Sequence, residues 1–396
     1  TTDLHGHLAD GLVGVADLVD QARSEGPEVL LVDSGDMWSG TLMSDRNEGA
    51  LGVKAYNALG YDAVAVGNHE FDYGPLGPER TGGEDPFEAL KVRLSEASFP
   101  VLSANLTDKA TGERPTWDNL YPSIMLRRGG FQIGIIGLTT EETASITFPH
   151  VGASLSFEGA ASALTREAKA LRDKGADLII AIAHIGGVCD SLADADDLST
   201  CDDDSELFTL VRAQPKGLVD IALGGHTHKR LAHRVNGVVV AHAAAQGDEI
   251  LDIEVSGRPG ELNIDIKAPV STEVTREVIG PARAALDAVL SEAIATQKAQ
   301  REERMGAKIL RPLTRDMQES SPLGSFLCDV LLTLHPDHDV CILNSGGVRA
   351  DIPAGDLTYG QLYDVMPFGN YAASVSLNGA SLLELLRLGT AGAHGV

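Results

Sequence analysis

Residues 224–228 (GGHTH) place two histidines, His226 and His228, directly after the apolar run 219–223. That run predicts a short buried strand, and the two glycines allow a turn from which both imidazoles leave the strand end together. Paired imidazoles are typical of a metal site, although His-x-His also occurs on ordinary strands where both rings are merely hydrogen-bonded. The pair is therefore a candidate that needs support from the rest of the chain.

Polar residues follow, or can follow, apolar runs at four other places. These places carry Asp3 with His5, Asp36, residues 67–70 (GNHE) and His184. Each alone has a common structural explanation, since Asp-Ser-Gly-Asp and Gly-Asn are frequent turn sequences and strand-end histidines often bond to backbone. Five such turns in order, each at a strand end, are not explained in that way. Other histidines, such as His233 and His242, lack this context and are interpreted as structural.

The chemistry that suits these residue types is a pair of metal ions. Two divalent cations about 3.5–4 Å apart need a bridging carboxylate, several imidazoles, and a carboxylate or amide to complete each shell. Such a pair lowers the pKa of a bound water and holds the oxygens of an in-line displacement at phosphorus. The matching residues are Asp3, His5 and His228 for one ion, Asn68, His184 and His226 for the other, and Asp36 as the bridge. This mixed ligation suits zinc, manganese, iron or cobalt and does not select among them.

His69 lies beside Asn68 and is not needed as a ligand. Its imidazole suits proton donation to a leaving oxygen, or stabilisation of the charge that develops there. Asp72, three residues later, suits holding that ring in the required tautomer. We therefore predict His69 and Asp72 as a catalytic pair.

Alternating helices and strands must position these residues. Apolar spacing predicts helices over residues 8–24, 50–59, 86–95 and 160–174, and strands over 28–32, 63–66, 101–104, 131–138 and 178–183. Repeated strand-helix-strand units build an α/β sheet with helices on its faces, and ligands collect at the carboxyl ends of its strands. Strands over 237–241 and 250–255 are expected to close this first domain as antiparallel neighbours.

A change of composition predicts a second, smaller α/β domain. Pro281 suits a first helical turn and Gly306 a helix stop, so residues 281–306 predict a long charged connector helix. Beyond it we expect a helix over 324–334, a buried strand over 340–343, the turn 344–347 and the segment 359–370. The predicted division is 1–279 and 307–396, with 280–306 as the linker helix.

Composition and charge limit the classes of function. A chain of 396 residues is long enough for two domains, and its mean hydropathy of −0.01 is typical of a globular protein. The formal net charge of −26 argues against nucleic acid as a partner, because no basic face offsets that field. A small anionic ligand would need a locally positive pocket, which metal ions and a few arginines supply. No apolar run reaches the length of a transmembrane span, and nothing indicates an oligomeric state.

The four cysteines are too few for a disulfide scaffold. Cys189 and Cys201 bracket an acidic, loop-like insertion, and a bridge between them would hold it and would favour an oxidising compartment. Two free thiols in a loop are the alternative, and a zinc site is disfavoured because no further Cys or His has a suitable spacing. Cys328 and Cys341 have apolar neighbours and are predicted to be core residues.

Neither terminus has the features of a natural chain end. The first residues already belong to a polar motif, without an initiator methionine or signal peptide, and the last helical run, 381–388, stops soon after it starts. We therefore interpret the sequence as part of a longer protein whose second domain is truncated.

Taken together, the motifs Asp3-x-His5, Gly35-Asp36, 67–70, His184 and 225–228 resemble the motif series of the calcineurin-like metallophosphoesterases. Residues 344–349 (NSGGVR), 350–355, 358–359 and 367–370 (PFGN) resemble the C-terminal domain of the bacterial 5′-nucleotidase and UDP-sugar hydrolase family. The resemblance covers nearly the whole chain, and the pairing of both motif sets is highly specific. It implies an α/β fold: a four-layer β-sandwich flanked by helices that binds two metal ions, a smaller α/β domain that binds substrate, and a helix between them that allows rotation.

The resemblance also implies roles for individual residues. It implies the metal ligands and the catalytic pair named above, and it implies substrate binding by Asn344, Gly346, Gly347, Arg349, Phe368 and Asn370. Within that set Arg349 matches a phosphate-binding arginine, and Phe368 matches one of two aromatics that stack on the base, the other being expected downstream of Val396. Arg311 and Arg315 resemble the family's other phosphate-side arginines, although the stretch 315–323 is one residue longer than usual. Arg311 is equally interpreted as a solvated charge, and Phe368 as a core residue.

The function implied is hydrolysis of 5′-nucleotides to nucleosides and phosphate, dependent on two divalent metal ions, with a small-molecule nucleotide as substrate. UDP-sugar hydrolysis, cleavage of 2′,3′-cyclic phosphates and thiosulfohydrolysis at the same site are alternatives. A non-catalytic nucleotide-binding protein is a further alternative, which the complete ligand set disfavours. The resemblance and the 189–201 cysteine pair together indicate a periplasmic or extracellular location.

Overall fold

The computed structural model describes residues 1–26, 28–77, 84–273, 279–316, 320–367 and 372–391. The chain divides into two compact units, Thr1–Ala293 and Ile294–Val396. The division falls within one helix, α9 (Pro281–Arg301).

Unit 1 is built on two sheets. The first is parallel, with the order β1-β2-β3-β5: Val32–Asp33, Ala63–Ala65, Val101–Leu102 and Leu120–Tyr121. The second has the order β11-β12-β10-β9-β7-β6: Leu231–Val235, Val238–His242, Ile221–Leu223, Leu178–His184, Phe131–Thr139 and Ser123–Arg128. Its four inner strands are parallel, and its two edge strands are antiparallel to their neighbours. Such fully buried parallel strands explain the nearly continuous apolar run over β9.

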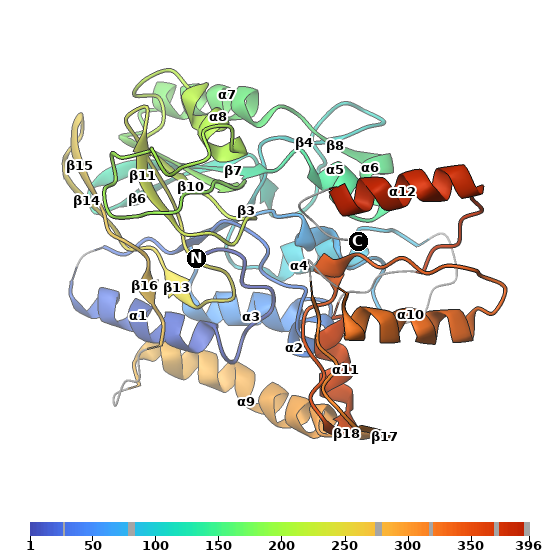
Figure 1. Ribbon diagram of the computed structural model, residues 1–396. Coiled ribbons are helices and arrows are strands. Elements are labelled where there is room, and N and C mark those ends of the chain that lie inside the picture. The colour runs from blue at the N-terminus through green and yellow to red at the C-terminus, as the bar shows by residue number, and fades with distance from the viewer. Residues whose placement is uncertain (27, 78–83, 274–278, 317–319, 368–371, 392–396) are drawn as a thin grey trace. The chain divides into compact units, whose positions relative to one another are not determined.

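Apolar side chains from both sheets form one core between them. Val32, Ala65 and Leu102 of the first sheet pack in one cluster with Ile135 and Ile180 of the second. Helices cover the outer faces: α1 (Leu12–Ser24), α3 (Ala50–Leu59) and α4 (Glu88–Glu96) on one side, α7 (Ala160–Asp173) and α8 (Glu206–Arg212) on the other (Figure 1). Unit 1 is therefore a four-layer α/β sandwich, and the expected fold class is confirmed.

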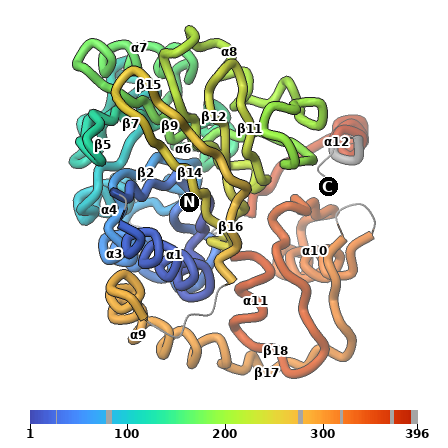
Figure 2. The backbone as a smooth tube through the Cα atoms, turned by 90° about the vertical axis from the view of Figure 1, so that its left-hand side faces the viewer, coloured from blue at the N-terminus to red at the C-terminus, as the bar shows by residue number. Residues whose placement is uncertain are grey.

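Shorter elements complete unit 1. These are α2 (Leu42–Asp45), η1 (His69–Phe71), α5 (Thr143–Ile146), α6 (Pro149–Ser154) and the strand pairs β4–β8 (Leu106–Asp108, Leu155–Phe157), β13–β16 (Glu249–Ile250, Val270–Ser271) and β14–β15 (Ile253–Arg258, Glu261–Ile266). The β14–β15 hairpin, yellow in Figure 2, packs Val255 and Ile264 against the inter-sheet core. The second of the predicted closing strands, 250–255, is therefore divided between β13 and β14, whereas β12 pairs with β10 and β11.

Local sequence explains where several helices stop. α3 matches the predicted range 50–59 and ends at Gly60, whose left-handed backbone (φ 71°) lets its N–H bond to Tyr56 O and Asn57 O. α9, by contrast, ends at Arg301, so the helix predicted over 281–306 is too long. Gly306 (φ 72°) lies instead in β17 (Arg304–Ile309), where the register with β18 (Gly355–Thr358) is irregular. A glycine interpreted as a helix stop thus lies at an irregularity in the strand pairing.

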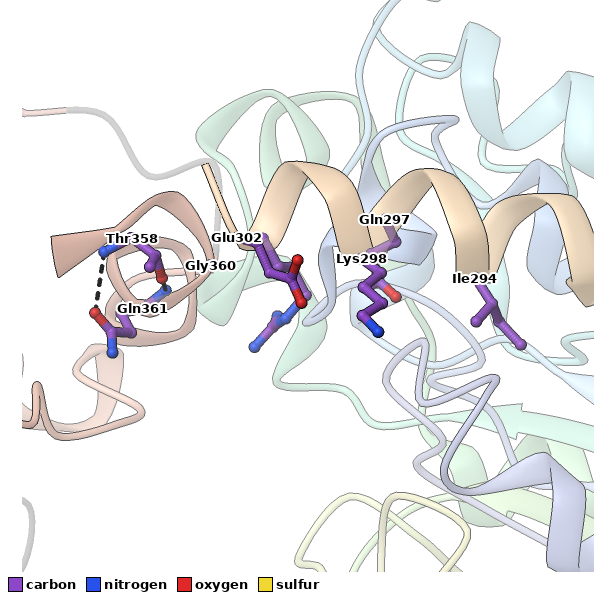
Figure 3. A pocket seen from close by; sticks show the side chains of 8 residues that line it. Ile294, Gln297, Lys298, Glu302, Thr358, Gly360 and Gln361 are labelled. Atoms are coloured by element: carbon purple, nitrogen blue, oxygen red, sulfur yellow. Dashed lines mark hydrogen bonds between the residues drawn. The ribbon is translucent and has the colours of Figure 1, made fainter. Parts of the chain in front are cut away.

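Unit 2 contains the β17–β18 hairpin, α10 (Pro322–Leu334), η2 (Ser345–Gly347), α11 (Tyr359–Val365) and α12 (Gly379–Ala391). Its small core consists of Leu323, Val348, Ile352, Leu357 and Val365. Thr358 caps α11 reciprocally with Gln361, and an open hollow of about 340 Å³ lies between the end of α9 and this cap (Figure 3). The described residues include no helix both long and apolar enough to cross a membrane.

Two predictions for unit 2 are wrong. Residues 340–343 form no strand within the described part of the chain, and Val340 and Ile342 are 48% and 40% exposed rather than buried. Cys328 and Cys341 are not core thiols but form a disulfide. Apolar neighbours suggested burial, yet the bridge joins a partly exposed face of α10 to this extended segment. The predicted Cys189–Cys201 bridge is confirmed.

Candidate metal centre

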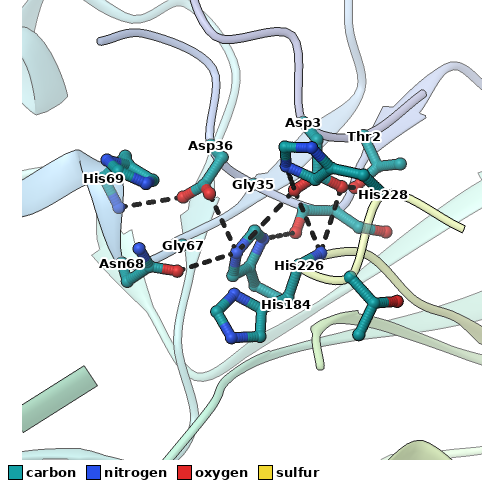
Figure 4. Close-up of polar contacts among 12 residues, drawn as sticks. Thr2, Asp3, Gly35, Asp36, Gly67, Asn68, His69, His184, His226 and His228 are labelled. Atoms are coloured by element: carbon teal, nitrogen blue, oxygen red, sulfur yellow. Dashed lines mark hydrogen bonds and ion pairs between the residues drawn. The ribbon is translucent and has the colours of Figure 1, made fainter. Parts of the chain in front are cut away.

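Five backbone segments of unit 1 bring the predicted ligands together at one end of the sandwich. Asp36 and Asn68 follow β1 and β2 of the first sheet, while His184 ends β9 and His226 follows β10 of the second. The first residues of the chain run beside the loop after β1, because Asp3 N donates to Gly35 O (2.9 Å) and His5 N to Asp36 O (3.0 Å). The carboxyl ends of strands from both sheets therefore meet at one polar cluster (Figure 4).

One ligand group consists of Asp3, His5 and His228. Nε2 of His228 lies 3.0 Å from Nε2 of His5 and 3.4 Å from Oδ1 of Asp3. The other ring nitrogen of His5, Nδ1, donates to Ser39 O at 3.0 Å, since a carbonyl can only accept. That bond fixes the tautomer of His5 and turns the Nε2 lone pair toward the group.

The second ligand group consists of Asp36, His184 and His226, with Asn68 beside it. His184 Nδ1 donates to Ser34 O (3.0 Å), so its Nε2 carries a lone pair in the neutral ring. This Nε2 faces two further acceptors, Asp36 Oδ2 at 3.0 Å and Asn68 Oδ1 at 3.1 Å. Three acceptors without a donor between them require a cation, which is either a proton on His184 or a metal ion. The donor set therefore fits a bound metal.

The pKa values of the residues in this cluster also indicate that it favours a cation. Burial opposes charge on His184, but the carboxylates of Asp36 and Asp3 outweigh it and raise the pKa of the imidazole to about 10. Burial would also raise the pKa of Asp36, yet His184 and His69 hold it well below its ordinary value. Burial lowers the pKa of His5 to about 3, so this ring is a neutral ligand at physiological pH.

The backbone that presents these ligands is strained. Five of the seven predicted ligands have left-handed backbone, with φ between 49° and 71°: Asp3, His5, Asp36, His226 and His228. For residues other than glycine this conformation costs about 1–2 kcal/mol each, and it persists only where the surroundings enforce it. Such strain, concentrated at one cluster, is typical of a functional site.

Glycines allow the ligand loops to approach closely. A Cβ at Gly225 would lie 2.3 Å from Thr2 Oγ1 and 2.9 Å from Asp3 Oδ2. A Cβ at Gly67 would lie 2.2 Å from Asp36 Oδ1. The glycine of each motif is therefore required by packing as well as by the turn.

The predicted pair His69 and Asp72 lies next to the ligand groups. His69 Nδ1 donates to Asp72 Oδ2 at 2.6 Å, and His69 N donates to Asp36 Oδ1 at 2.9 Å. The ring of His69 also lies 4.9 Å from the ring of His5, centroid to centroid. Burial opposes protonation of His69, but Asp72 and Asp36 raise its pKa to about 9. The imidazole is consequently protonated at neutral pH.

Two buried residues that the sequence analysis did not single out support the site. Ser39 donates its hydroxyl to Asp72 Oδ2 (2.5 Å) while its carbonyl accepts from His5. Glu70 accepts from three backbone N–H groups, and burial and Asp36 raise its pKa to about 8. The motif around His69 contains Glu70, so a carboxylate there was the available signal; nothing in the sequence marked Ser39.

In unit 2 the predicted substrate-binding residues are partly brought together. Nη1 of Arg349 donates to Gly346 O (3.3 Å), Nη1 of Arg315 donates to Val348 O (3.3 Å), and partial burial together with Arg315 lowers the pKa of Arg349. The turn that carries Gly346 and Gly347 is capped by Asn344, whose Oδ1 accepts from Gly346 N at 3.0 Å. Arg311 is exposed. Phe368 and Asn370 lie outside the described residues.

A further cluster, Cys189, Cys201 and His233, also has the proximity of a metal site. Its two sulfur atoms are bonded to each other, however, so neither is available as a thiolate ligand. This cluster is therefore interpreted as the contact of the disulfide-anchored loop with β11, on which His233 lies.

Comparison with known proteins agrees with this geometry. The chain is 29% identical to a 5′-nucleotidase of Vibrio cholerae, over 98% of this chain and 74% of that protein, and 28% identical to Protein UshA of Escherichia coli over the same shares. The crystal structure of a 5′-nucleotidase precursor from Thermus thermophilus is similar with a TM-score of 0.72 and 25% identity, over 93% of this chain and 73% of that one.

Two family descriptions match separate parts of the chain. The 5′-nucleotidase C-terminal domain matches residues 296–395, and calcineurin-like phosphoesterase matches residues 1–230, more than half of the sequence. Members of the second family use divalent metal ions, which agrees with the donor set at the strand ends. The chain therefore belongs to the calcineurin-like phosphoesterases, a family of hydrolases, and carries a 5′-nucleotidase C-terminal domain.

Proposed function

We propose that this protein hydrolyses 5′-nucleotides to nucleosides and phosphate at two divalent metal ions. The similarity to 5′-nucleotidases over nearly the whole chain supports the substrate class. The observation that carries the proposal is the acceptor cluster of His184, Asp36 and Asn68, because it requires a cation next to a second group of ligands. Zinc, manganese, iron and cobalt all suit this donor set.

The two ligand groups support a division of the ligands between two ions. Asp3, His5 and His228 hold one ion, His184, His226 and Asn68 hold the other, and Asp36 lies between them. When bound, such a pair supplies Lewis acidity at phosphorus and an acidified water. Nδ1 of His5 and of His184 donates to the backbone carbonyls of Ser39 and Ser34, so Nε2 of each ring is the atom that would bind a metal ion, in His184 after loss of its Nε2 proton.

His69 protonates the leaving oxygen in this proposal. The hydrogen bond to Asp72 engages Nδ1, so Nε2 is the atom that would donate to the leaving oxygen in this proposal. Since Asp72 and Asp36 raise the pKa of His69, against the effect of burial, the ring carries both protons at neutral pH. Transfer of the Nε2 proton converts the departing nucleoside alkoxide into its alcohol.

Unit 2 supplies binding groups for the anionic substrate. Partial burial and the nearby Arg315 lower the pKa of Arg349, and a bound phosphate would favour the charged form of this guanidinium. Asn344 with Gly346 and Gly347 shapes the turn that leads to Arg349. Arg311, Phe368 and Asn370 remain predicted contacts of the substrate.

A substrate comparison tests this proposal. Metal-free protein is reconstituted with manganese or zinc and assayed for phosphate release from AMP, UDP-glucose, a 2′,3′-cyclic nucleotide and an aryl phosphate, and for sulfate release from a thiosulfonate. We expect AMP to give the highest kcat/KM. A higher value for another substrate would reassign the substrate class, and no turnover of any of them with metal occupancy confirmed would refute the phosphohydrolase.

We also propose that the protein works in the periplasm or outside the cell. Both cysteine pairs of the described residues form disulfides, which persist in oxidising compartments. Fractionation of the native host, with an antibody against this chain, is expected to place it outside the cytoplasm. Recovery in the cytoplasmic fraction with reduced thiols would contradict this location.

A further inference from the structure

Glu70 is a buried carboxylate to which the proposed mechanism gives no part. Only 1% of its surface is exposed, and it lies in η1, directly after the predicted proton donor His69. A buried carboxylate is costly unless its oxygens are hydrogen-bonded, so the partners of Glu70 indicate what it does.

Three backbone N–H groups from two different loops donate to this carboxylate. Oε2 accepts from Asp36 N at 2.9 Å and from Gly67 N at 2.5 Å, while Oε1 accepts from Met37 N at 2.8 Å. Asp36 and Met37 belong to the loop after β1, and Gly67 to the loop after β2. One side chain therefore ties together the loops that carry Asp36 and Asn68.

A further hydrogen bond joins the same two loops, with its acceptor on the loop after β1. Asp36 Oδ1 accepts from His69 N at 2.9 Å, which leaves Oδ2 directed at His184. Asp36 itself has left-handed backbone (φ 57°), a conformation that needs outside support. Gly67 permits the approach, because a Cβ there would lie 2.2 Å from Asp36 Oδ1 and 2.8 Å from Glu70 Oε2.

We propose that Glu70 is a positioning residue that holds the strained backbone of Asp36 against the loop of Asn68 and thereby sets the separation of the two metal ions. In this role Glu70 is not a ligand, and it acts through the direction of Asp36 Oδ2. The inference rests on the proposed function, since it assigns Asp36 as the bridge between the ions.

The nearly isosteric variant Glu70→Gln tests the role. The glutamine side chain has nearly the same volume but only one acceptor oxygen. Its N–H group would face at least one backbone N–H, so at least one of the three hydrogen bonds of Glu70 is lost. Gly67→Ala separates the same two loops from the opposite side. Glu167→Gln is the matched control, because Glu167 lies on α7, accepts from Ser123 Oγ at 2.8 Å and has no part in the site.

The measurements are manganese binding to the metal-free full chain, the electron paramagnetic resonance spectrum of the loaded protein, and kcat and KM for AMP. We expect Glu70→Gln and Gly67→Ala to bind manganese about 10–100-fold more weakly and to alter the spin coupling between the two ions. We expect kcat to fall by a similar factor while KM changes by less than about threefold, since the substrate contacts are untouched. Glu167→Gln should match the wild type.

Unchanged manganese affinity, spin coupling and kcat in Glu70→Gln would overturn the inference, even if its melting temperature falls, because Glu70 would then serve stability alone. If Glu70→Gln does not fold, Glu70→Asp, which keeps the carboxylate but shortens its reach, decides in the same way. Failure of the wild type to bind two ions or to hydrolyse AMP would instead refute the proposed function, so the two failures are distinguishable.

Discussion

At the scale of a single residue, Ser39 contacts both a predicted metal ligand and the residue that orients the predicted proton donor. Its carbonyl accepts from Nδ1 of His5, and its hydroxyl donates to the carboxylate of Asp72 that holds His69. Its own N–H is bonded to Tyr73 Oη at 3.1 Å, and its backbone is left-handed (φ 68°). A metal ligand and the predicted proton donor are thus oriented by the same buried serine.

Removing the hydroxyl of Ser39 is expected to slow the reaction without removing metal. Ser39→Ala keeps the carbonyl that orients His5 but leaves Asp72 without one donor, so kcat should fall about tenfold with manganese content unchanged. Steady-state kinetics and metal analysis check this. Ser103→Ala is the control, since it removes a buried hydroxyl bonded to Thr139 at 3.0 Å. Equal effects of both variants would show that Ser39 has no specific role.

His69→Ala separates proton donation from metal binding. We expect both metal ions to remain bound and kcat to fall by about 10²-fold or more, because proton transfer to the leaving oxygen is lost. An aryl phosphate with an acidic phenol should lose less, since its leaving group needs little protonation. Loss of metal in this variant would instead make His69 a ligand and our assignment wrong.

At the scale of elements, local sequence patterns predicted where helices and strands lie in the chain better than how they are arranged in space. Apolar spacing located α3, β7 and β9 to within a residue or two, and the strand-end polar residues followed from that placement. The order of strands in two stacked sheets depends on contacts far apart in sequence, so it was not predicted, and the layered architecture came only from the resemblance. Ser39 and Glu70 were missed for the same reason, because their partners lie about 30 residues away.

The errors in unit 2 have a common physical origin. Val340 and Ile342 have strand-like side chains, but no described strand pairs with them and both are exposed. Gly306 has the positive φ expected of a helix stop, but positive φ occurs both at helix ends and at irregularities in strand pairing. Residue type alone does not distinguish burial from exposure, or one left-handed position from another.

The two disulfides predict a defined peptide map. Proteolysis of alkylated, non-reduced protein should give linked peptides for Cys189 with Cys201 and for Cys328 with Cys341, and for no other pairing. Removal of the first bridge by Cys189→Ser with Cys201→Ser should lower the free energy of unfolding by about 2–4 kcal/mol, because it frees a loop. Mass spectrometry and thermal unfolding check both outcomes. Free thiols in the native protein would contradict this pairing.

At the scale of the whole molecule, the net charge of −26 repels an anionic substrate. Bound cations at the site would offset this repulsion locally. Asp3 and Asp36 lie buried near one another among imidazoles, so metal binding should stabilise the folded chain. At a free metal concentration 100-fold above Kd the expected gain is about 2.7 kcal/mol for each ion. A chelator should therefore lower the melting temperature by several degrees, and a melting temperature unaffected by chelation would argue against bound metal.

Titration of the metal-free protein with manganese, with phosphate release from AMP followed at each addition, tests the central claim most directly. If two ions bound by the strand-end ligands perform the hydrolysis, activity should reach its plateau at two equivalents of manganese per chain. Full activity at one equivalent, or no activity with two ions bound, would contradict the account.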